Sequence, residues 1–326
     1  MRSAAAALIA ACSLIGCEPE PQAFRGATMG TTYSVKYVGA DPVDVVRGEV
    51  EAVLAEVNLL FSTYDEASEI SQFNARATSE GFPVSSKFRE LLDLALDVAG
   101  GTSGAFDPTM LPLVDLYGFG PSAQRRIPSD EEISSVLERV GYEQLEFVDG
   151  GGLVAGHPDL QLDLSAIAKG WGVDRVCGAL DRRGIESYMV EIGGEVRCAG
   201  LKRAGQPWMI GIEGPGESPG LELVDKVALR DMALATSGSY RNFVRVEAVS
   251  AHHILDPRTG KNPDNRVVSV SVRAPSCALA DALATALMVT GPDGAADVLG
   301  RYEGASALFL VARGVREVRA REVGWR

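Results

Sequence analysis

The stretch LQLDLSAIAKGWGVDRVCGALDRRGIESYMVEI, residues 160–192, carries the strongest indication of the fold. Its centre, from about Ser165 to Arg182, is predicted to be a helix, and β-type segments flank it at Leu160 to Leu164 and Tyr188 to Ile192. A second helix is expected from Cys277 to Val289. This order predicts an α+β fold, in which flanking helices cover a mixed, mainly antiparallel sheet. Further β-type segments continue the pattern at Trp208 to Glu213, Val227 to Leu234, Val267 to Val272 and Ala307 to Val311.

The N-terminal part of the chain is predicted to supply supporting helices. One strand is expected from Thr32 to Val38. Apolar residues at helical spacing predict helices from Asp44 to Phe61 and from Ser86 to Ala99. Ser129 to Glu132 has the pattern of a capping box and predicts the start of a third helix.

The first residues have the composition of a secretory signal. Residues 1–16 contain one arginine and an apolar run, and Leu14-Ile15-Gly16-Cys17 has the pattern of a lipobox. A buried first helix or a membrane span is the alternative, but the run is too short to cross a bilayer. We expect a signal peptide at 1–16, lipidation of Cys17, a tether over 17–24, and a domain over 25–326 built as one unit or as two intimate subdomains. The expected location is the periplasmic face of a bacterial envelope membrane.

The charge of the chain argues against nucleic acid as a partner. There are 44 acidic and 31 basic residues, and the formal net charge is -13. An anionic substrate would therefore be bound by local features, such as a metal ion or helix N-termini.

Three cysteines remain after the signal and the lipidated residue, namely Cys177, Cys198 and Cys277. An envelope location permits a disulfide, but the spacing shows neither CxxC nor a zinc pattern. We expect these cysteines to be small buried hydrophobic residues.

The helix predicted from residue 277 onward carries a candidate metal site. Asp281 and Thr285 are four residues apart, so their carboxylate and hydroxyl project from the same helix face. Mg²⁺ prefers oxygen ligands and completes its shell with water and substrate phosphates. A solvated helix face is the structural alternative.

His253 is a candidate general base because an imidazole titrates near neutral pH. His252 is its adjacent rival. If the chain is extended here, the two side chains point to opposite sides and only one can serve a site. A structural role is the alternative for either histidine.

Several motifs occur in a fixed order along the chain. Together they resemble the FAD:protein FMN transferases of the ApbE family, from about Met29 to about Gly291. The resemblance implies an ApbE-like, T-fold-like architecture. The motifs are Met29-Gly30-Thr31-Thr32, STYDEASEISQFN at 62–74, SGAFDPT at 103–109, Gly118-Phe119-Gly120, LDLSAIAKGWGVD at 162–174, EIGGEVRCAG at 191–200, ATSGSYRNF at 235–243, HILDPRTG at 253–260 and ADALAT at 280–285.

The resemblance also implies a reaction and residues for it. FMN would pass from FAD to a Thr or Ser hydroxyl of an acceptor protein with release of AMP, which is phosphoryl transfer. Asp281, Thr285 and the backbone carbonyl of Ala166 would hold Mg²⁺, and His253 would be the general base. Some relatives have an acidic residue where this chain has Ala284, so we expect weak binding of free Mg²⁺. The residues carried over as FAD contacts are Met29, Tyr64, Ala105, Phe106, Asp107, Asp163, Lys169 and Leu255.

Some of these FAD contacts have simpler explanations. Tyr64 and Phe106 offer flat surfaces for a ring, but either could be a core residue. Asp107 and Asp163 also suit turns or helix caps. Lys169 falls where relatives vary, and its ammonium could meet a phosphate or only water.

Two other functions remain open at this point. With water as the nucleophile, the same site would make an FAD pyrophosphatase that yields FMN and AMP. A flavin-binding lipoprotein without chemistry would need neither the metal pair nor the base. The resemblance implies that the acceptor is a subunit of a membrane redox complex, whose target motif has Asp upstream of Ser/Thr-Gly-Ala-Ser/Thr.

Overall fold

The computed structural model describes residues 20–76, 81–121, 124–148, 150–202, 205–214, 223–239, 243–246, 249–313 and 318–325. The expected signal peptide and Cys17 lie outside these ranges. Strand β1 begins at Gln22 and Phe24 is buried, so the last residues of the expected tether belong to the domain. Among the helices in these ranges, none combines the length and the apolar character that a bilayer crossing requires.

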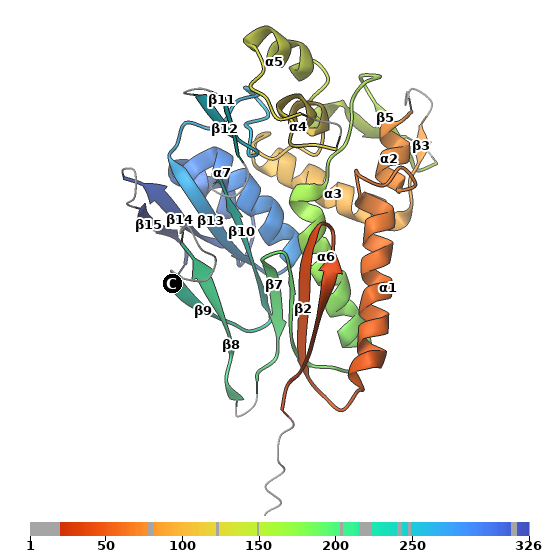
Figure 1. Ribbon diagram of the computed structural model, residues 1–326, viewed down its shortest axis with the longest axis vertical. Helices are drawn as coiled ribbons and strands as arrows, with labels where there is room; N and C mark the ends of the chain where they lie inside the picture. The colour runs from red at the N-terminus through yellow and green to blue at the C-terminus, as the bar shows by residue number, and fades with distance from the viewer. Residues whose placement is uncertain are drawn as a thin grey trace, which may run out of the picture.

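An eight-stranded sheet forms the core (Figure 1). Its order is β1-β2-β6-β7-β10-β13-β14-β15, and every neighbouring pair is antiparallel. The predicted α+β class with a mainly antiparallel core is therefore confirmed. In sheet order, the strands span Gln22–Thr28, Thr31–Val38, Ser187–Ile192, Glu195–Ala199, Met232–Gly238, Val267–Ala274, Ser306–Ala312 and Val318–Val323.

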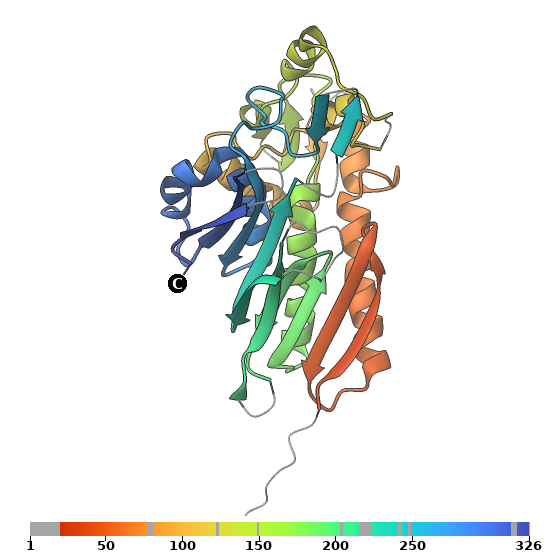
Figure 2. The same ribbon diagram turned by 60° about the vertical axis from the view of Figure 1, so that its left-hand side comes forward.

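The sheet has two apolar faces because successive side chains of a strand point to opposite sides. In β10, Ala233 and Ala235 belong to the main core, whereas Leu234 between them belongs to a second cluster. Figure 2 shows helices along one face of the sheet. These helices are α1 (Val43–Phe61), α6 (Ser165–Arg182) and α7 (Cys277–Leu299). The hairpin of β8 (Trp208–Glu213) and β9 (Leu223–Leu229) contributes to the second cluster, on the other face.

Two strands predicted from the sequence are wrong. The stretch from Val227 to Leu234 contains the end of β9 and the start of β10, because the chain reverses at Arg230-Asp231, where Asp231 has a φ of 53°. Residues 160–164 form no strand, although the three leucines there are buried. The side chain of Asn74 bonds the backbone of Leu162 instead, accepting from its N–H at 2.7 Å and donating to its carbonyl at 2.9 Å. A side-chain partner thus replaces the strand neighbour that the pattern suggested.

Helices α6 and α7 cross at Gly170. A Cβ on Gly170 would lie 2.3 Å from the carbonyl oxygen of Cys277, so the crossing requires glycine. Asp174, one turn further along α6, accepts from the backbone N–H groups of Cys277 at 3.0 Å and Ala278 at 2.9 Å and so caps α7. Arg197 of β7 holds this carboxylate at 2.6 Å. The two helices are therefore fixed to each other where the candidate site residues begin.

Helix α7 continues ten residues beyond Val289, where the sequence predicted its end, to Leu299. The helix is kinked at Gly291, which has a φ of 73°, and Pro292 follows. Asn265 Nδ2 donates to the carbonyls of Met288 at 2.7 Å and Val289 at 3.1 Å. These bonds satisfy carbonyl groups at the kink, which lets the element continue.

Smaller elements gather at one end of the sheet (Figure 1). The capping box of α5 is confirmed, since Ser129 Oγ accepts from the Glu132 amide and Glu132 Oε2 accepts from the Ser129 amide. A third apolar cluster joins α4, α5 and the segment after β12. These elements are α2 Glu69–Asn74, β3 Phe82–Pro83, α3 Ser86–Gly101, α4 Leu111–Tyr117, α5 Asp130–Leu137, a 3₁₀ turn Tyr142–Gln144, β4 Leu145–Phe147, β5 Gly152–Ala155, β11 Phe243–Val246 and β12 Val249–His252.

The cysteines Cys177, Cys198 and Cys277 are free and buried. Burial raises the pKa of each thiol, to about 12 for Cys198. They are small core residues, as the sequence predicted.

Candidate active site

Three charged side chains meet where α6, β7 and α7 converge. Lys169 Nζ lies 3.3 Å from Glu195 Oε1 and 3.5 Å from Asp281 Oδ2. The backbone N–H of Gly170 also donates to Asp281 Oδ2, at 3.0 Å. The side chains of Glu195 and Asp281 are only 5% and 4% exposed, whereas that of Lys169 is 29% exposed. The lysine, carried over as an FAD contact, is thus held by two buried carboxylates.

Burial and ion pairing together set the ionisation of this cluster. It raises the pKa of Glu195 to about 7, against the opposing effect of Lys169. It also raises the pKa of Asp281, against Lys169 and the Gly170 amide. Burial alone would lower the pKa of Lys169, but the two carboxylates outweigh it and raise that pKa. Glu195 Oε2 is buried and has no hydrogen-bond partner in the part of the chain that the structure describes. The cluster is therefore short of positive charge.

Thr285 follows Asp281 on α7, as the spacing predicted, and its hydroxyl lies 3.2 Å from Ser237 Oγ of β10. Thr236 pairs instead with the Ser271 hydroxyl of β13, at 2.8 Å. Residues 236–238 form the end of strand β10. Because Asp281 is buried, a solvated helix face does not explain the Asp281 and Thr285 pair.

Two more of the predicted residues lie along α6. Ala166 is in the first turn of the helix and packs partly buried against the main core. Met29 and Gly30, with φ of 48° and 69°, form the tight turn between β1 and β2. The Met29 methyl group lies 3.0 Å from where a Cβ of Gly172 would be, so this turn rests on α6. Ala284 is a fully buried core residue and offers no side-chain ligand.

The segment Ala105 to Asp107 lies largely inside the protein. Ala105 and Phe106 are core residues, 1% and 3% exposed, so Phe106 does not offer its ring face as the sequence suggested it could. Asp107 Oδ1 accepts from the Thr109 amide at 2.8 Å and the Thr109 hydroxyl at 2.6 Å, and Oδ2 accepts from the Tyr142 amide at 2.9 Å. Burial raises the pKa of Asp107, and these bonds lower it. Asp107 therefore stabilises a local turn, which is the structural role that its sequence position also suits.

Asp163 and Tyr64 have different surroundings. Asp163 Oδ1 accepts from the Ser165 amide at 2.8 Å, at the start of α6. Its own N–H donates to the Pro108 carbonyl at 2.8 Å, which joins the 105–109 loop to α6. Burial raises the pKa of Asp163. Tyr64, between α1 and α2, is 75% exposed, so its ring is accessible for stacking and is not a core residue.

The two adjacent histidines have different surroundings. His252 ends β12, its Nδ1 lies 3.2 Å from Asn262 Nδ2, and burial lowers its pKa to about 4. His253 follows the strand, and its ring meets that of Phe119 edge-on at 6.3 Å between centroids. Leu255 packs in the third apolar cluster. His252 is thus a neutral structural histidine at neutral pH, which leaves His253 as the candidate base.

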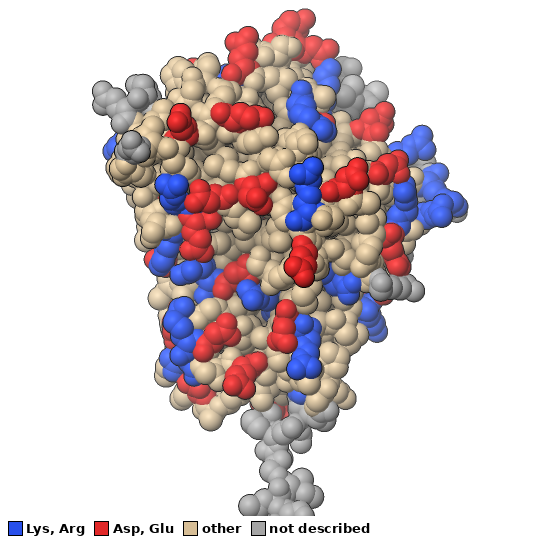
Figure 3. Space-filling model, turned by 180° about the vertical axis from the view of Figure 1, so that it is seen from behind, with Lys and Arg blue, Asp and Glu red and all other residues tan. Residues whose placement is uncertain are grey.

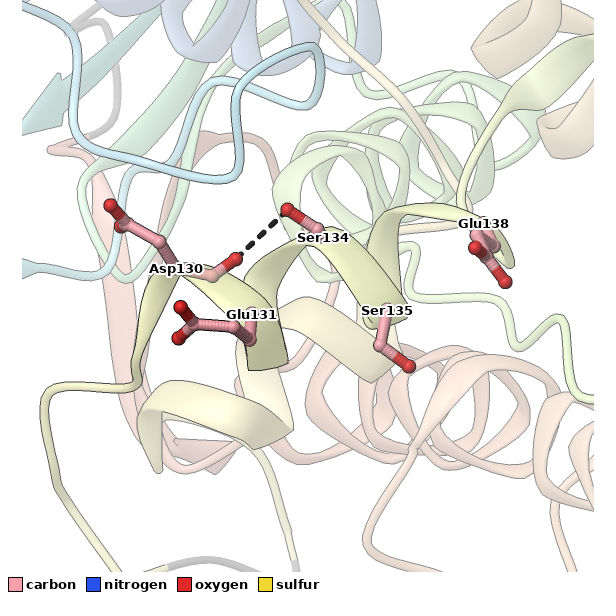
Figure 4. A pocket seen from close by; sticks show the side chains of 5 residues that line it. All are labelled: Asp130, Glu131, Ser134, Ser135 and Glu138. Atoms are coloured by element: carbon pink, nitrogen blue, oxygen red, sulfur yellow. Dashed lines mark hydrogen bonds between the residues drawn. The ribbon is translucent and has the colours of Figure 1, made fainter.

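A shallow hollow on the outer side of α5 is unrelated to this cluster. Figure 4 shows its lining of exposed acidic and serine side chains, with Ser134 Oγ donating to the Asp130 carbonyl. None of these residues belongs to the cluster around Lys169. Within the described ranges, no three His, Cys, Asp or Glu side chains are grouped so as to hold a metal ion by themselves.

The fold and the ordered motifs coincide with those of one family, whose model matches residues 29–309. The chain belongs to the ApbE family. Two ApbE relatives are named FAD:protein FMN transferase. The protein from Vibrio cholerae is 45% identical over 299 residues, covering 90% of this chain and 89% of the relative. The protein from Haemophilus influenzae is 35% identical, covering 94% and 91%.

Solved ApbE structures have the same architecture. The flavin transferase ApbE from Vibrio cholerae aligns with a TM-score of 0.83 at 41% identity, covering 94% of this chain and 98% of that one. The apo form of the flavinyl transferase ApbE from Pseudomonas stutzeri aligns with a TM-score of 0.83 at 37% identity, covering 93% and 94%. The predicted family and fold are confirmed.

Sequence reasoning missed two residues that shape the site. Glu195 lies inside the motif EIGGEVRCAG and Asp174 closes the motif LDLSAIAKGWGVD, and the sequence assigns a role to neither residue. A carboxylate directly after the pair Gly193-Gly194, at the start of a largely apolar strand, is the available signal for Glu195. Nothing local indicated that Asp174 would cap a helix more than 100 residues away.

Proposed function

We propose that this protein transfers FMN from FAD to a Thr or Ser hydroxyl of an acceptor protein and releases AMP. The observation that carries the proposal is the buried Asp281 carboxylate beside Lys169, with the Thr285 hydroxyl one turn further along α7. Such an arrangement suits a cation that is bound together with phosphates. The named relatives, FAD:protein FMN transferases, supply the substrate and the direction of transfer.

The chemistry is a displacement at the phosphorus of the FMN moiety. The acceptor hydroxyl oxygen forms a bond to that phosphorus, and the bond from the phosphorus to the bridging oxygen breaks. AMP leaves with the bridging oxygen and its electron pair, and His253 takes the proton of the hydroxyl group. The ammonium of Lys169 supplies fixed positive charge beside the pyrophosphate, and Tyr64 offers an exposed ring for the flavin or adenine.

The residues of the site fit Mg²⁺. The Asp281 carboxylate, the Thr285 hydroxyl and the Ala166 carbonyl are hard oxygen donors, and the single ammonium of Lys169 is shared by two buried carboxylates, which supports a further cation there. Bound Mg²⁺ would neutralise charge on the pyrophosphate oxygens. Since only one carboxylate belongs to this donor set, phosphates and water would complete the shell.

One assay tests the function. Purified protein is incubated with FAD, Mg²⁺ and an acceptor domain that carries Asp upstream of Ser/Thr-Gly-Ala-Ser/Thr, and both AMP and in-gel flavin fluorescence are followed. Transfer yields AMP together with a fluorescent acceptor band. AMP without the band means FAD pyrophosphatase activity, and neither signal means a flavin-binding protein, so both results reject the proposal.

We further propose that the protein works at the periplasmic face of an envelope membrane, anchored by lipid on Cys17, on a subunit of a membrane redox complex. The pattern of residues 14–17 supports the anchor. Replacing Cys17 by Ala should abolish labelling by a fatty-acid analogue, and unchanged labelling would refute the anchor.

A further inference from the structure

Asp281 already has a cationic partner in the structure. Lys169 Nζ lies 3.5 Å from Asp281 Oδ2, and the Gly170 amide donates to the same oxygen. The proposed function assigns Asp281 to Mg²⁺ as well. Two cations on one carboxylate repel each other, and burial weakens the screening of that repulsion. The lysine and the metal ion therefore compete for Asp281.

Lys169 also has a second anionic partner. Glu195 Oε1 lies 3.3 Å from the same ammonium, and the Glu195 side chain is 5% exposed. Its other oxygen, Oε2, is buried without a hydrogen-bond partner among the residues described. The ammonium can therefore leave Asp281 and stay paired, because Glu195 on strand β7 already contacts it.

We propose that Lys169 is an internal cation that occupies Asp281 in the metal-free protein, and that Glu195 retains it when Mg²⁺ binds. This inference rests on the proposed function and deepens it. With the lysine on Asp281, free Mg²⁺ binds weakly. When FAD arrives, its pyrophosphate adds negative charge for both cations, so metal and nucleotide bind cooperatively. The lysine is thus a positioning residue that couples metal binding to the presence of substrate.

The test measures metal affinity without FAD, by calorimetry with Mg²⁺ and by electron paramagnetic resonance with Mn²⁺. The Lys169→Met variant keeps the length of the side chain and removes its charge. It should bind either ion at least tenfold more tightly than the unchanged protein. Equal or weaker binding overturns the proposal. Lys169→Arg keeps a positive charge at this position. By the same competition argument, its metal affinity should stay within about twofold of that of the unchanged protein.

A matched control separates the local effect from net charge. Lys87, on α3, forms an ion pair with Glu56 at the surface, where the two side chains are 35% and 46% exposed. Lys87→Met makes the same change in charge and should leave metal affinity unchanged. If it strengthens binding as much as Lys169→Met does, the effect is general electrostatics and the proposal fails. Asp281→Asn should abolish tight binding in the Lys169→Met background, and persistent binding would place the ion elsewhere and refute the competition.

The role of Glu195 is tested by a double-mutant cycle. Glu195→Gln leaves Lys169 with Asp281 alone and should weaken metal binding at least threefold. In the Lys169→Met background, Glu195→Gln should change metal affinity by less than about twofold, because Glu195 acts through the lysine. An equal loss in both backgrounds makes Glu195 a direct ligand and overturns its retaining role. Should Lys169→Met fail to fold, Glu195→Gln alone decides, since equal or tighter binding contradicts the proposal.

The transfer assay keeps this inference apart from the proposed function. If the unchanged protein transfers FMN while Lys169→Met gains no metal affinity, only the inference is wrong. If Lys169→Met gains affinity but no transfer occurs, the competition stands and the proposed function is wrong.

Discussion

At the scale of single residues, the two adjacent histidines can be separated by experiment. Replacing His253 by Ala removes the proposed base and should lower the transfer rate by about 10²–10⁴-fold, while FAD binding is retained. Single-turnover transfer and flavin fluorescence titration measure the two quantities. His252→Gln is the matched control, because His252 is a half-buried, neutral residue, and it should keep transfer within about threefold on the same reasoning. Full activity of His253→Ala would remove the base from the mechanism.

His252 also makes stability depend on pH. Burial lowers its folded pKa to about 4, below the ordinary value of 6.5, so the unfolded chain binds its proton more readily between these values. The stabilisation is complete above about pH 6.5 and is lost as the pH falls through 4, by at most about 3 kcal/mol.

Chemical denaturation at pH 7 and pH 4.5 measures this effect. His252→Gln should lose less free energy of unfolding on acidification than the unchanged protein does. An equal loss in both proteins would show that carboxylates alone cause the acid sensitivity.

The local placement of the candidate residues could be predicted from the sequence, but their contacts could not. The spacing of Asp281 and Thr285 was enough to place both on one helix face, because α-helical geometry is local. That Lys169 would bridge Asp281 and Glu195 could not be foreseen, since the three residues come from α6, β7 and α7 and meet only through packing. The burial of Phe106 could not be predicted either, because the sequence offered both an accessible ring and a core residue, and only the packing decides between them.

At the scale of elements, the crossing of α6 and α7 can be tested with one methyl group. Gly170→Ala would put a Cβ 2.3 Å from the Cys277 carbonyl oxygen. We expect a loss of about 1–3 kcal/mol in the free energy of unfolding and weaker FAD binding, because the helices must separate.

Gly178→Ala, on the same helix, is the control for this change. Its Cβ would meet only the end of the Arg182 side chain, at 3.6 Å. That variant should be about 0.5–1 kcal/mol more stable through helix propensity. Thermal and chemical unfolding of both variants measure the difference, and equal effects would show that the crossing tolerates a side chain.

Helices were predicted more reliably than strands. Helix α1 and the capping box of α5 follow from apolar periodicity and local side-chain bonds, both of which depend only on residues close in sequence. The false strand at 160–164 arose because buried leucines alternate there, while the partner is the side chain of Asn74, almost ninety residues away. The length of α7 could not be foreseen, because Pro292 normally ends a helix and the side chain that satisfies the carbonyls at the kink, Asn265, lies outside the helix.

At the scale of the whole molecule, net charge should govern how fast FAD arrives. The formal net charge is -13, and Figure 3 shows acidic and basic side chains interspersed over the face it displays, without a broad basic area. The field of the protein therefore repels an anionic nucleotide at long range. Raising the salt concentration from about 0.01 to 0.1 M shortens the Debye length from about 30 to 10 Å and should speed FAD association several-fold.

Stopped-flow flavin fluorescence at constant free Mg²⁺ measures this rate. Riboflavin, which has no phosphate, is the matched ligand and should associate at a rate that salt does not change. Slower FAD association at higher salt would mean that local attraction by Lys169 outweighs the field of the whole protein.

The three buried thiols have a consequence for where this protein can mature. Since Cys177, Cys198 and Cys277 are free and sealed inside the core, no covalent cross-link among them holds the native state together. The chain should reach the same fold in a reducing cytosol and in an oxidising compartment, without help from a disulfide isomerase. Its thermal transition should accordingly coincide with and without dithiothreitol, which makes ordinary cytosolic expression of the domain a sound source of material.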